Sequence, residues 1–209
     1  MRKIVIVMGS IAFLLLAFGI FAMAGSQEKI TTQKTKSESV KQKSNTNDLV
    51  AKGRYLVSIE GCNDCHSPKT AIMPIPVPDS SRLLSGHPSA DKMPEVPSGV
   101  FSPDKWVATT IGDMTAWAGL WGTSYAFNLT PDNTTGIGAW TEDIFIKTMR
   151  TGKHMGAGRD ILPPMPWYDL GMAKNSDLKA IFAYLKSLKP VSNLVPQPVF
   201  ASEPDMKKP

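Results

Sequence analysis

Two cysteines and a histidine form the stretch of this chain that is best suited to chemistry. Cys62 and Cys65 are its only cysteines, and His66 follows directly in the sequence GCNDCH. Thiols at positions i and i+3 of a helical turn lie on one face, which suits addition to two vinyl groups at one edge of a porphyrin. The imidazole of His66 can then reach the iron as its proximal ligand. The motif predicts one haem c, covalently bound through Cys62 and Cys65.

Three other interpretations of this motif are less well supported by the rest of the sequence. A structural zinc site needs four ligands, and only His87 and His154 remain as further histidines, both in polar surroundings that predict exposed side chains. A thioredoxin-like redox pair needs a βαβ context, which the proline-rich chain after the motif does not offer. A disulfide between Cys62 and Cys65 explains neither the histidine nor the export signal described below.

The second axial ligand decides the function, because a haem bound through His66 alone would keep one open face. Met165 stands among prolines in ILPPMPWY, residues 161–168, and the fixed φ angles of proline make this segment stiff and extended. Thioether sulfur favours ferrous iron and raises the reduction potential. We therefore predict Met165 as the second ligand. Three rivals remain open: Met93, His87 and His154.

The charge distribution argues against nucleic acid as a partner. The chain has 209 residues, a net charge of +5 and a pI near 9.2. The positive excess lies before residue 48, where seven Lys and Arg residues accompany two Glu residues. From residue 48 onward there are sixteen positive and sixteen negative side chains. A neutral folded part lacks the basic surface that nucleic acids require.

The N-terminal region predicts export and leaves its fate open. Residues 1–24 combine Arg2-Lys3 with an apolar run over residues 4–24, as in a signal peptide or an N-terminal membrane anchor. As a helix this run would rise about 31 Å, enough for a bilayer core of roughly 30 Å. Residues 25–47 are polar and predict a flexible linker, which favours a retained anchor. We expect the folded domain on the periplasmic side of the cytoplasmic membrane, anchored or soluble.

Apolar periodicity predicts three helices in the folded domain, residues 48–190. The first covers residues 48–59 and leads into the cysteine motif. The second covers residues 141–151, with Thr141 as its N-cap, and the third covers residues 176–188. Residues 191–209 then form a C-terminal tail with little pattern.

A long insert separates the first two helices. Residues 71–127 predict an irregular loop, because many prolines interrupt the first part. Residues 106–111 and 115–118 flank Gly112-Asp113 and are compatible with a short β-hairpin. The insert could wrap the edge of the haem, and its role stays open.

Three segments give the chain its resemblance to a known family: KGRYLVSIEGCNDCHSP (52–68), NLTPDNTTGIGAWTEDIFIKTMRTGKHMG (128–156) and ILPPMPW (161–167). In these the chain resembles class I monohaem c-type cytochromes, specifically the bacterial type related to cytochrome subunits of membrane dehydrogenases. The resemblance implies an all-α, cytochrome c-like haem domain with a long loop insert. It also implies that the first helix crosses the last.

The resemblance further implies particular contacts. Gly53 would lie at the helix crossing, against Phe182 or Tyr184. Met165 is supported as an iron ligand. Arg150 would lie near a haem propionate, and Trp140 or Trp167 would lie against the ring, although a surface cation and two core aromatics explain these three equally well.

The expected function is electron transfer rather than catalysis, since no convincing set of acid, base and nucleophile stands in the sequence. A dehydrogenase or quinol-oxidising complex would donate electrons, and a terminal oxidase or another cytochrome would accept them. Two alternatives remain: a haem enzyme or gas sensor with an open distal site, and a fixed electron-transfer subunit of a dehydrogenase complex.

Overall fold

The computed structural model describes residues 45–71, 75–96 and 99–201. The predicted signal or anchor and residues 25–44 of the predicted linker lie outside these ranges, whereas residues 45–47 are helical. Among the described residues, no helix has both the length and the apolar character needed to cross a bilayer. The chain divides into two compact units, Met1–Asn47 and Asp48–Pro209, and the following description concerns the second.

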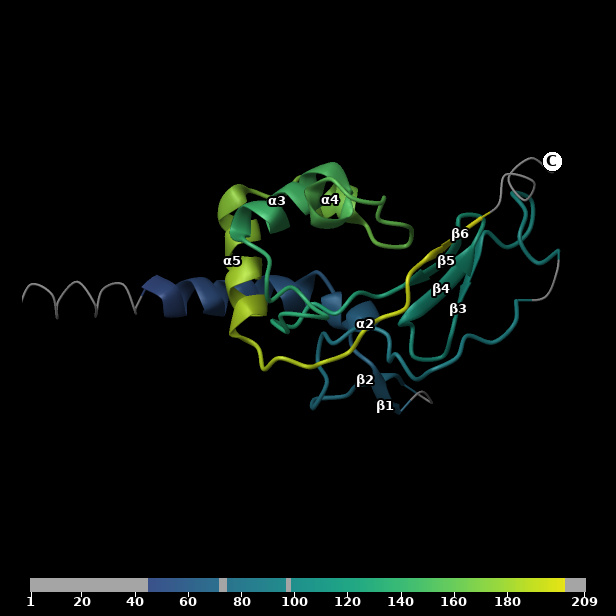
Figure 1. The fold of residues 1–209 in the computed structure, drawn as a ribbon, viewed down its shortest axis with the longest axis horizontal. Coiled ribbons are helices and arrows are strands. Elements are labelled where there is room, and N and C mark those ends of the chain that lie inside the picture. The colour runs from purple at the N-terminus through teal and green to yellow at the C-terminus, as the bar shows by residue number, and fades with distance from the viewer. Residues whose placement is uncertain (1–44, 72–74, 97–98, 202–209) are drawn as a thin grey trace, which may run out of the picture. The chain divides into compact units, whose positions relative to one another are not determined.

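The fold is mixed α/β, so the prediction of an all-α domain is wrong. The described residues of this unit form both helices and two antiparallel sheets. Figure 1 shows α3 and α5 at one end of this unit, the four-stranded sheet at the other, and α2 between them. The prediction failed because the strands are only two to four residues long. Segments this short carry almost no alternating pattern.

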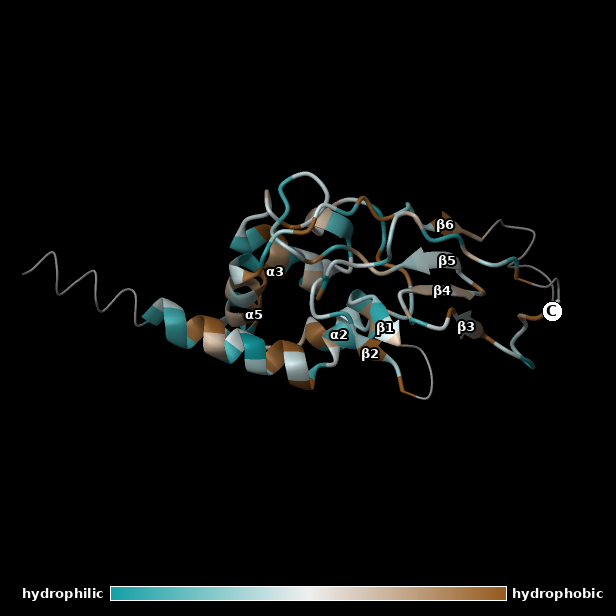
Figure 2. Cartoon of the chain, turned by 90° about the horizontal axis from the view of Figure 1, so that it is seen from below, coloured by the Kyte–Doolittle hydropathy of each residue, from teal (hydrophilic) through white to brown (hydrophobic). Residues whose placement is uncertain are grey.

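The larger sheet occupies the C-terminal part of the predicted loop insert, whose first part is largely irregular as expected. It consists of β3 (Ala108–Thr110), β4 (Ala116–Gly119), β5 (Gly122–Tyr125) and β6 (Val199–Phe200), in that order. Figure 2 shows these strands side by side. The β3–β4 pair, with Thr110 opposite Trp117, confirms the hairpin predicted around Gly112-Asp113. A smaller sheet pairs β1 (Lys69–Ala71) with β2 (Val77–Pro78).

The first helix, residues 45–59, crosses α5 (Asn175–Ser187) at a glycine. A Cβ atom on Gly53 would clash with the carbonyl oxygen of Ala180 and lie 2.7 Å from Cβ of Tyr184. The crossing of the first and last helices is therefore confirmed, with Tyr184 as the aromatic neighbour. Phe182 instead packs on Phe145, with ring centroids 5.4 Å apart. Only a residue without a side chain lets the two backbones approach this closely.

The helix α3 (Glu142–Thr151) forms as its sequence predicts. Thr141 is the N-cap, and its side chain accepts a hydrogen bond from the backbone N–H of Ile144. Gly152 ends the helix in the left-handed conformation, at φ 65°. The buried face of α3 packs against α5 in the apolar core, which contains Val57, Leu84, Ile137, Phe145, Met149, Leu178, Ile181, Phe182 and Leu185.

The segment after α5 returns along the domain to the sheet. Asn128, fully buried, donates a hydrogen bond from Nδ2 to the carbonyl of Val191, at 2.8 Å. Asn193 donates from Nδ2 to the carbonyls of Ser85 and His87, both at 2.8 Å. Residues 191–200, part of the predicted tail, are thus bonded to Ser85, His87 and Asn128 at one end. At the other end they form β6, which pairs with β5.

Candidate functional site

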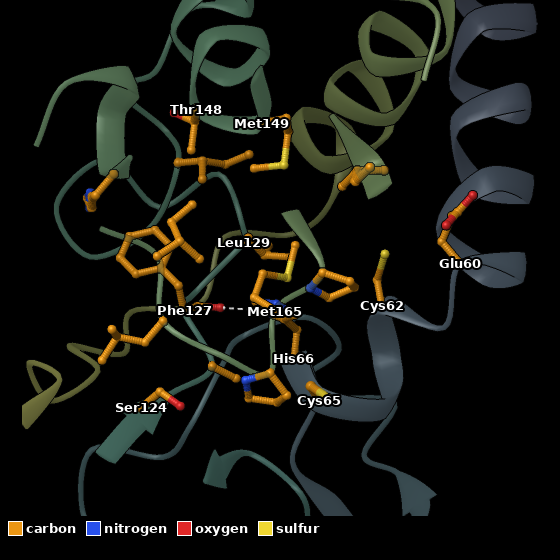
Figure 3. A pocket seen from close by; sticks show the side chains of 18 of the residues that line it. Glu60, Cys62, Cys65, His66, Ser124, Phe127, Leu129, Thr148, Met149 and Met165 are labelled. Carbon is orange, nitrogen blue, oxygen red and sulfur yellow. Dashed lines mark hydrogen bonds between the residues drawn. The ribbon is translucent and has the colours of Figure 1, made fainter. Parts of the chain in front are cut away.

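A cavity of about 350 Å³ lies between the helices and the larger sheet. Its walls come from residues 57–66, the end of the sheet with residues 124–129, the helices α3 and α5, and residues 161–170, which include the short helix α4 (Trp167–Leu170). Figure 3 shows side chains from several of these segments converging on one space. The lining is mainly apolar, so the cavity suits a large hydrophobic ligand with few polar groups.

The predicted haem-binding cysteines lie on the wall of this cavity. Helix α2 (Cys62–His66) carries both, and both thiols are free and half-buried. Burial, followed by the nearby Glu60 carboxylate, raises the pKa of Cys62 to about 11. Burial and Asp64 also raise the pKa of Cys65, partly offset by Lys69. Both thiols are therefore protonated and available at neutral pH.

His66 is held in a form that can bind a metal. Its Nδ1 lies 2.8 Å from the carbonyl oxygen of Phe127, which can only accept, so Nδ1 carries the proton (Figure 3). Its Nε2 is therefore an unprotonated donor atom for a metal, and it has no hydrogen-bond partner in the described ranges. Burial lowers the pKa of His66, which keeps the ring neutral.

Lys69 fixes the end of α2. Its ammonium group donates to three main-chain carbonyls, those of Asn63, Asp64 and Ser67, at 3.2, 2.8 and 2.6 Å. A cation at a helix C-terminus satisfies unpaired carbonyls and complements the helix dipole. The side chain thus helps to position the cysteines and His66 on the cavity wall.

Two methionines line the cavity, and only one of them stands out in the sequence. Met165 lies on the segment before α4, and Met149 projects from α3 (Figure 3). The loop of Met165 is attached to the sheet, because the Ser124 hydroxyl donates to the carbonyl of Pro163 at 2.6 Å. Met149 is 7% exposed and also packs in the apolar core. Met93, the main rival by sequence, lines a different cavity.

The other two histidines differ from expectation. His87 was predicted to be exposed, which is wrong: it is 0% exposed and lies outside the cavity lining. Nδ1 of His87 lies 2.8 Å from the hydroxyl oxygen of Thr115, which is also fully buried. His154, in the 3₁₀ turn η1 (His154–Gly156), is half-buried and lines the cavity. Flanking glycine and lysine residues suggested exposure, but tertiary packing covers both rings.

Of the three tentative haem contacts, the structure brings one to the cavity. Trp140 lines it and stacks on Phe127, with ring centroids 6.0 Å apart. Trp167 lies outside the lining and packs over Gly152. Arg150 also lies outside, where its guanidinium donates to the carbonyl of Ala173 and to Oδ1 of Asn175, at 2.7 and 2.8 Å. The bonding of Arg150 matches that of a cation on the helix surface.

Several lining residues escaped sequence reasoning. Trp117 and Tyr125 enter the cavity wall from β4 and β5, and Phe127 follows from the same insert. Arg159 lines the cavity from the loop after η1. Trp117 lies on a strand of the predicted hairpin, but nothing in its local pattern indicated that its side chain faces a cavity, and the short strand β5 with the following Phe127 was not recognised at all. Arg159 reaches the cavity through the path of the loop after η1, which the sequence does not reveal.

Comparison with known proteins identifies relatives, although no family model matches the chain. It is 32% identical over 136 residues to the gluconate 2-dehydrogenase cytochrome c subunit of Pantoea cypripedii, covering 65% of this chain and 22% of that protein. Over 145 residues it is 26% identical to the alcohol dehydrogenase (quinone) cytochrome c subunit of Gluconobacter oxydans, covering 69% and 22%. It is also 35% identical over 71 residues to the fructose dehydrogenase cytochrome subunit of Gluconobacter japonicus, covering 34% and 14%.

The chain is therefore related to cytochrome c subunits of dehydrogenases. The matched parts span 22% or less of the length of these three relatives.

The residues of the cavity fit a haem. Two free thiols three positions apart, an imidazole with an available Nε2 and a thioether all lie on one apolar cavity. Within the described ranges, no group of three or more His, Cys, Asp or Glu side chains is placed to hold a metal ion. The donor set thus corresponds to a ligand that brings its own metal and attaches through sulfur.

Proposed function

We propose that this protein is an electron carrier with one haem c, covalently attached through Cys62 and Cys65 and bound axially by His66 and Met165. A single observation supports this most strongly. The two thiols and the imidazole of α2 line the same apolar cavity as the Met165 thioether, which comes from a distant part of the chain. Relationship to cytochrome c subunits of dehydrogenases agrees with it.

The protein residues would hold the cofactor rigid rather than take part in bond making. When bound, the haem supplies a one-electron iron couple. The hydrogen bond from Nδ1 of His66 to Phe127 fixes the imidazole plane, and the bond between Ser124 and Pro163 restrains the loop of Met165. Held in place in this way, His66 and Met165 would keep the surroundings of the iron nearly unchanged when an electron arrives or leaves. The apolar lining excludes water and, with the thioether ligand, favours the ferrous form.

We further propose a dehydrogenase as the electron donor, or alternatively a quinol-oxidising complex. A terminal oxidase or another cytochrome would accept the electrons. The location proposed is the periplasmic side of the cytoplasmic membrane, reached through the N-terminal segment, with residues 4–24 as an anchor if they are retained. Because the relatives are named as subunits of dehydrogenases, a fixed place in such a complex is favoured over a freely diffusing carrier.

The identity of the second axial ligand can be tested by comparing the two methionines that line the cavity. We expect Met165→Ala to abolish the low-spin methionine-ligated spectrum and to open the iron to carbon monoxide in the reduced protein. The matched control is Met149→Leu, which nearly conserves volume and should retain the native spectrum. Rapid carbon monoxide binding by the unmodified protein would instead support a haem enzyme or gas sensor with an open distal site.

Subunit character is a separate question with its own experiment. A fixed subunit should copurify in constant ratio with a dehydrogenase after mild solubilisation from its own host. Recovery of the haem protein free of any such partner, with electron transfer intact, would favour a mobile carrier.

A further inference from the structure

Arg159 is a cation in an apolar cavity without an acidic partner. It is half-buried, and no other Arg or Lys of the described ranges lines this cavity. Its side chain donates a hydrogen bond from Nη1 to the carbonyl of Asp160, at 3.3 Å. The carboxylate of Asp160 pairs instead with Lys153. Burial lowers the pKa of Arg159. A guanidinium that lines an apolar cavity interacts more favourably with an anion there than it would in water.

His154 and Trp140 lie on the same cavity, and their rings are in contact. The His154 ring centroid is 5.4 Å from that of Trp140 and 5.2 Å from that of Phe127. Neither the His154 ring nor the Trp140 indole N–H has a hydrogen-bond partner in the part of the chain that the structure describes. Arg159 lines the same cavity, and burial followed by its positive charge lowers the pKa of His154. Polar N–H groups without protein acceptors therefore gather on one apolar cavity.

We propose that Arg159 and His154, with Trp140 beside them, form a carboxylate-binding wall that receives the propionates of the haem, and that protonation of His154 tunes its reduction potential. This inference rests on the proposed function. It assigns the propionate contact to Arg159 instead of Arg150, whose guanidinium is already used outside the cavity.

The chemistry of the cofactor supports this placement. The two carboxylates of a haem stand at the edge opposite its vinyl groups, and the vinyl edge is fixed by Cys62 and Cys65. The propionates should avoid acidic side chains, which would repel them. Three acidic residues line the cavity: Glu60 and Asp64, beside the cysteines, and Asp169 on α4. Arg159 can bind a carboxylate through two parallel N–H groups, the geometry in which guanidinium is strongest.

The charges around His154 set the sign of the pH effect. Next to His154 in the sequence, Lys153 forms an ion pair with Asp160. Arg159, a few residues further on, carries a positive charge. From α3, the Lys147 side chain packs against Gly156. Burial and Arg159 lower the pKa of His154, so its proton is held weakly until a carboxylate lies near. Ferrous haem carries one positive charge less than ferric haem, so protonated His154 repels it less strongly. Protonation of His154 therefore favours the ferrous form. The reduction potential should therefore fall as pH rises through the titration of His154.

The experiment is a redox titration of the purified holoprotein between about pH 5 and 9, followed by absorbance. We expect the unmodified protein to show a fall in potential that corresponds to a change of about threefold to tenfold in the reduction equilibrium. His154→Gln should remove most of this dependence. Arg159→Gln should lower the potential at every pH, whereas Arg159→Lys should restore part of it. Arg150→Gln, which also removes one guanidinium, serves as the matched control and should change the potential little.

The outcomes separate this inference from the proposed function. A haem-loaded, low-spin protein whose potential does not depend on pH, or responds to Arg150→Gln but not to Arg159→Gln, would overturn the carboxylate wall and leave electron transfer intact. A chain that binds no haem would overturn both. The pH profile of the unmodified protein requires no variant, so misfolding of a variant cannot hide the answer.

Discussion

The helical wall and the sheet wall of the cavity are built in different ways. The helical wall, from residues 48–59 with α3 and α5, packs through apolar side chains and contributes Met149, and Gly53 lies where residues 48–59 cross α5. The sheet wall, from β4 and β5 with residues 126–129, is held by strand pairing and by buried polar side chains such as Asn128. Close apolar packing thus supports one wall and hydrogen bonding the other.

This difference indicates how the two walls share the work of the site. The helical wall provides the core on which the domain depends. The sheet wall provides the acceptor that orients His66, through the carbonyl of Phe127, and the hydroxyl of Ser124 that restrains the loop of Met165. Damage to the helical wall should therefore reduce the stability of the domain most, whereas damage to the sheet wall should cost less stability and can also alter the site.

The largest effect is expected at the helix crossing. Gly53→Leu places a side chain where a Cβ already clashes with the Ala180 carbonyl, so the helices must separate, and we expect a loss of about 3 kcal/mol or more of stability. Ala51→Leu adds the same side chain at an exposed position of the same helix and should change stability little. Chemical denaturation of the two variants measures the difference. Equal stabilities would show that the crossing is not tightly packed.

An intermediate effect is expected at Asn128. Its Oδ1 accepts from the N–H and the hydroxyl of Thr130, and its Nδ2 donates to Val191. Asn128→Ala leaves buried partners unsatisfied, which should cost about 2–3 kcal/mol. Asn133→Ala, at an exposed position in the same loop, is the matched control. Denaturation monitored by tryptophan fluorescence tests this, and a loss no greater than that of the control would refute it.

The smallest of these effects is expected at Trp117. Trp117→Phe removes the hydrogen bond from its indole N–H to the carbonyl of Met114, 2.9 Å long, and should cost about 1 kcal/mol. Because Trp117 lines the cavity, the haem absorbance should also shift. Trp106→Phe, at a tryptophan that is 71% exposed, should change neither stability nor spectrum. If Trp117→Phe changed stability and left the spectrum untouched, the sheet would not form part of the haem environment.

The helical wall could be predicted from the sequence because its signals are local. Apolar spacing located the three helices to within a few residues, and Thr141 and Gly152 mark the ends of α3. The position of Gly53 at the helix crossing was implied by the resemblance instead. The motif at residues 62–66 and the prolines around Met165 likewise pointed to residues that meet on one cavity.

Apart from the β3–β4 hairpin, the sheet wall could not be predicted because its signals are long-range. Strand β6 pairs with β5 across residues 126–198, and no property of either segment announces the other. Burial of His87 depends on Thr115 and Asn193, which approach it only after the chain has folded. Arg159 was missed for the same reason, whereas Arg150 was favoured by resemblance alone.

The central claim is that one haem is attached through Cys62 and Cys65. Intact-mass measurement of the protein, produced in a host able to mature c-type cytochromes and then denatured, tests it most directly. We predict the mass of the chain plus one haem, and the mass of the chain alone for the Cys62→Ser, Cys65→Ser double variant. A colourless protein with zinc in place of iron, or a haem that dissociates on denaturation, would contradict the claim.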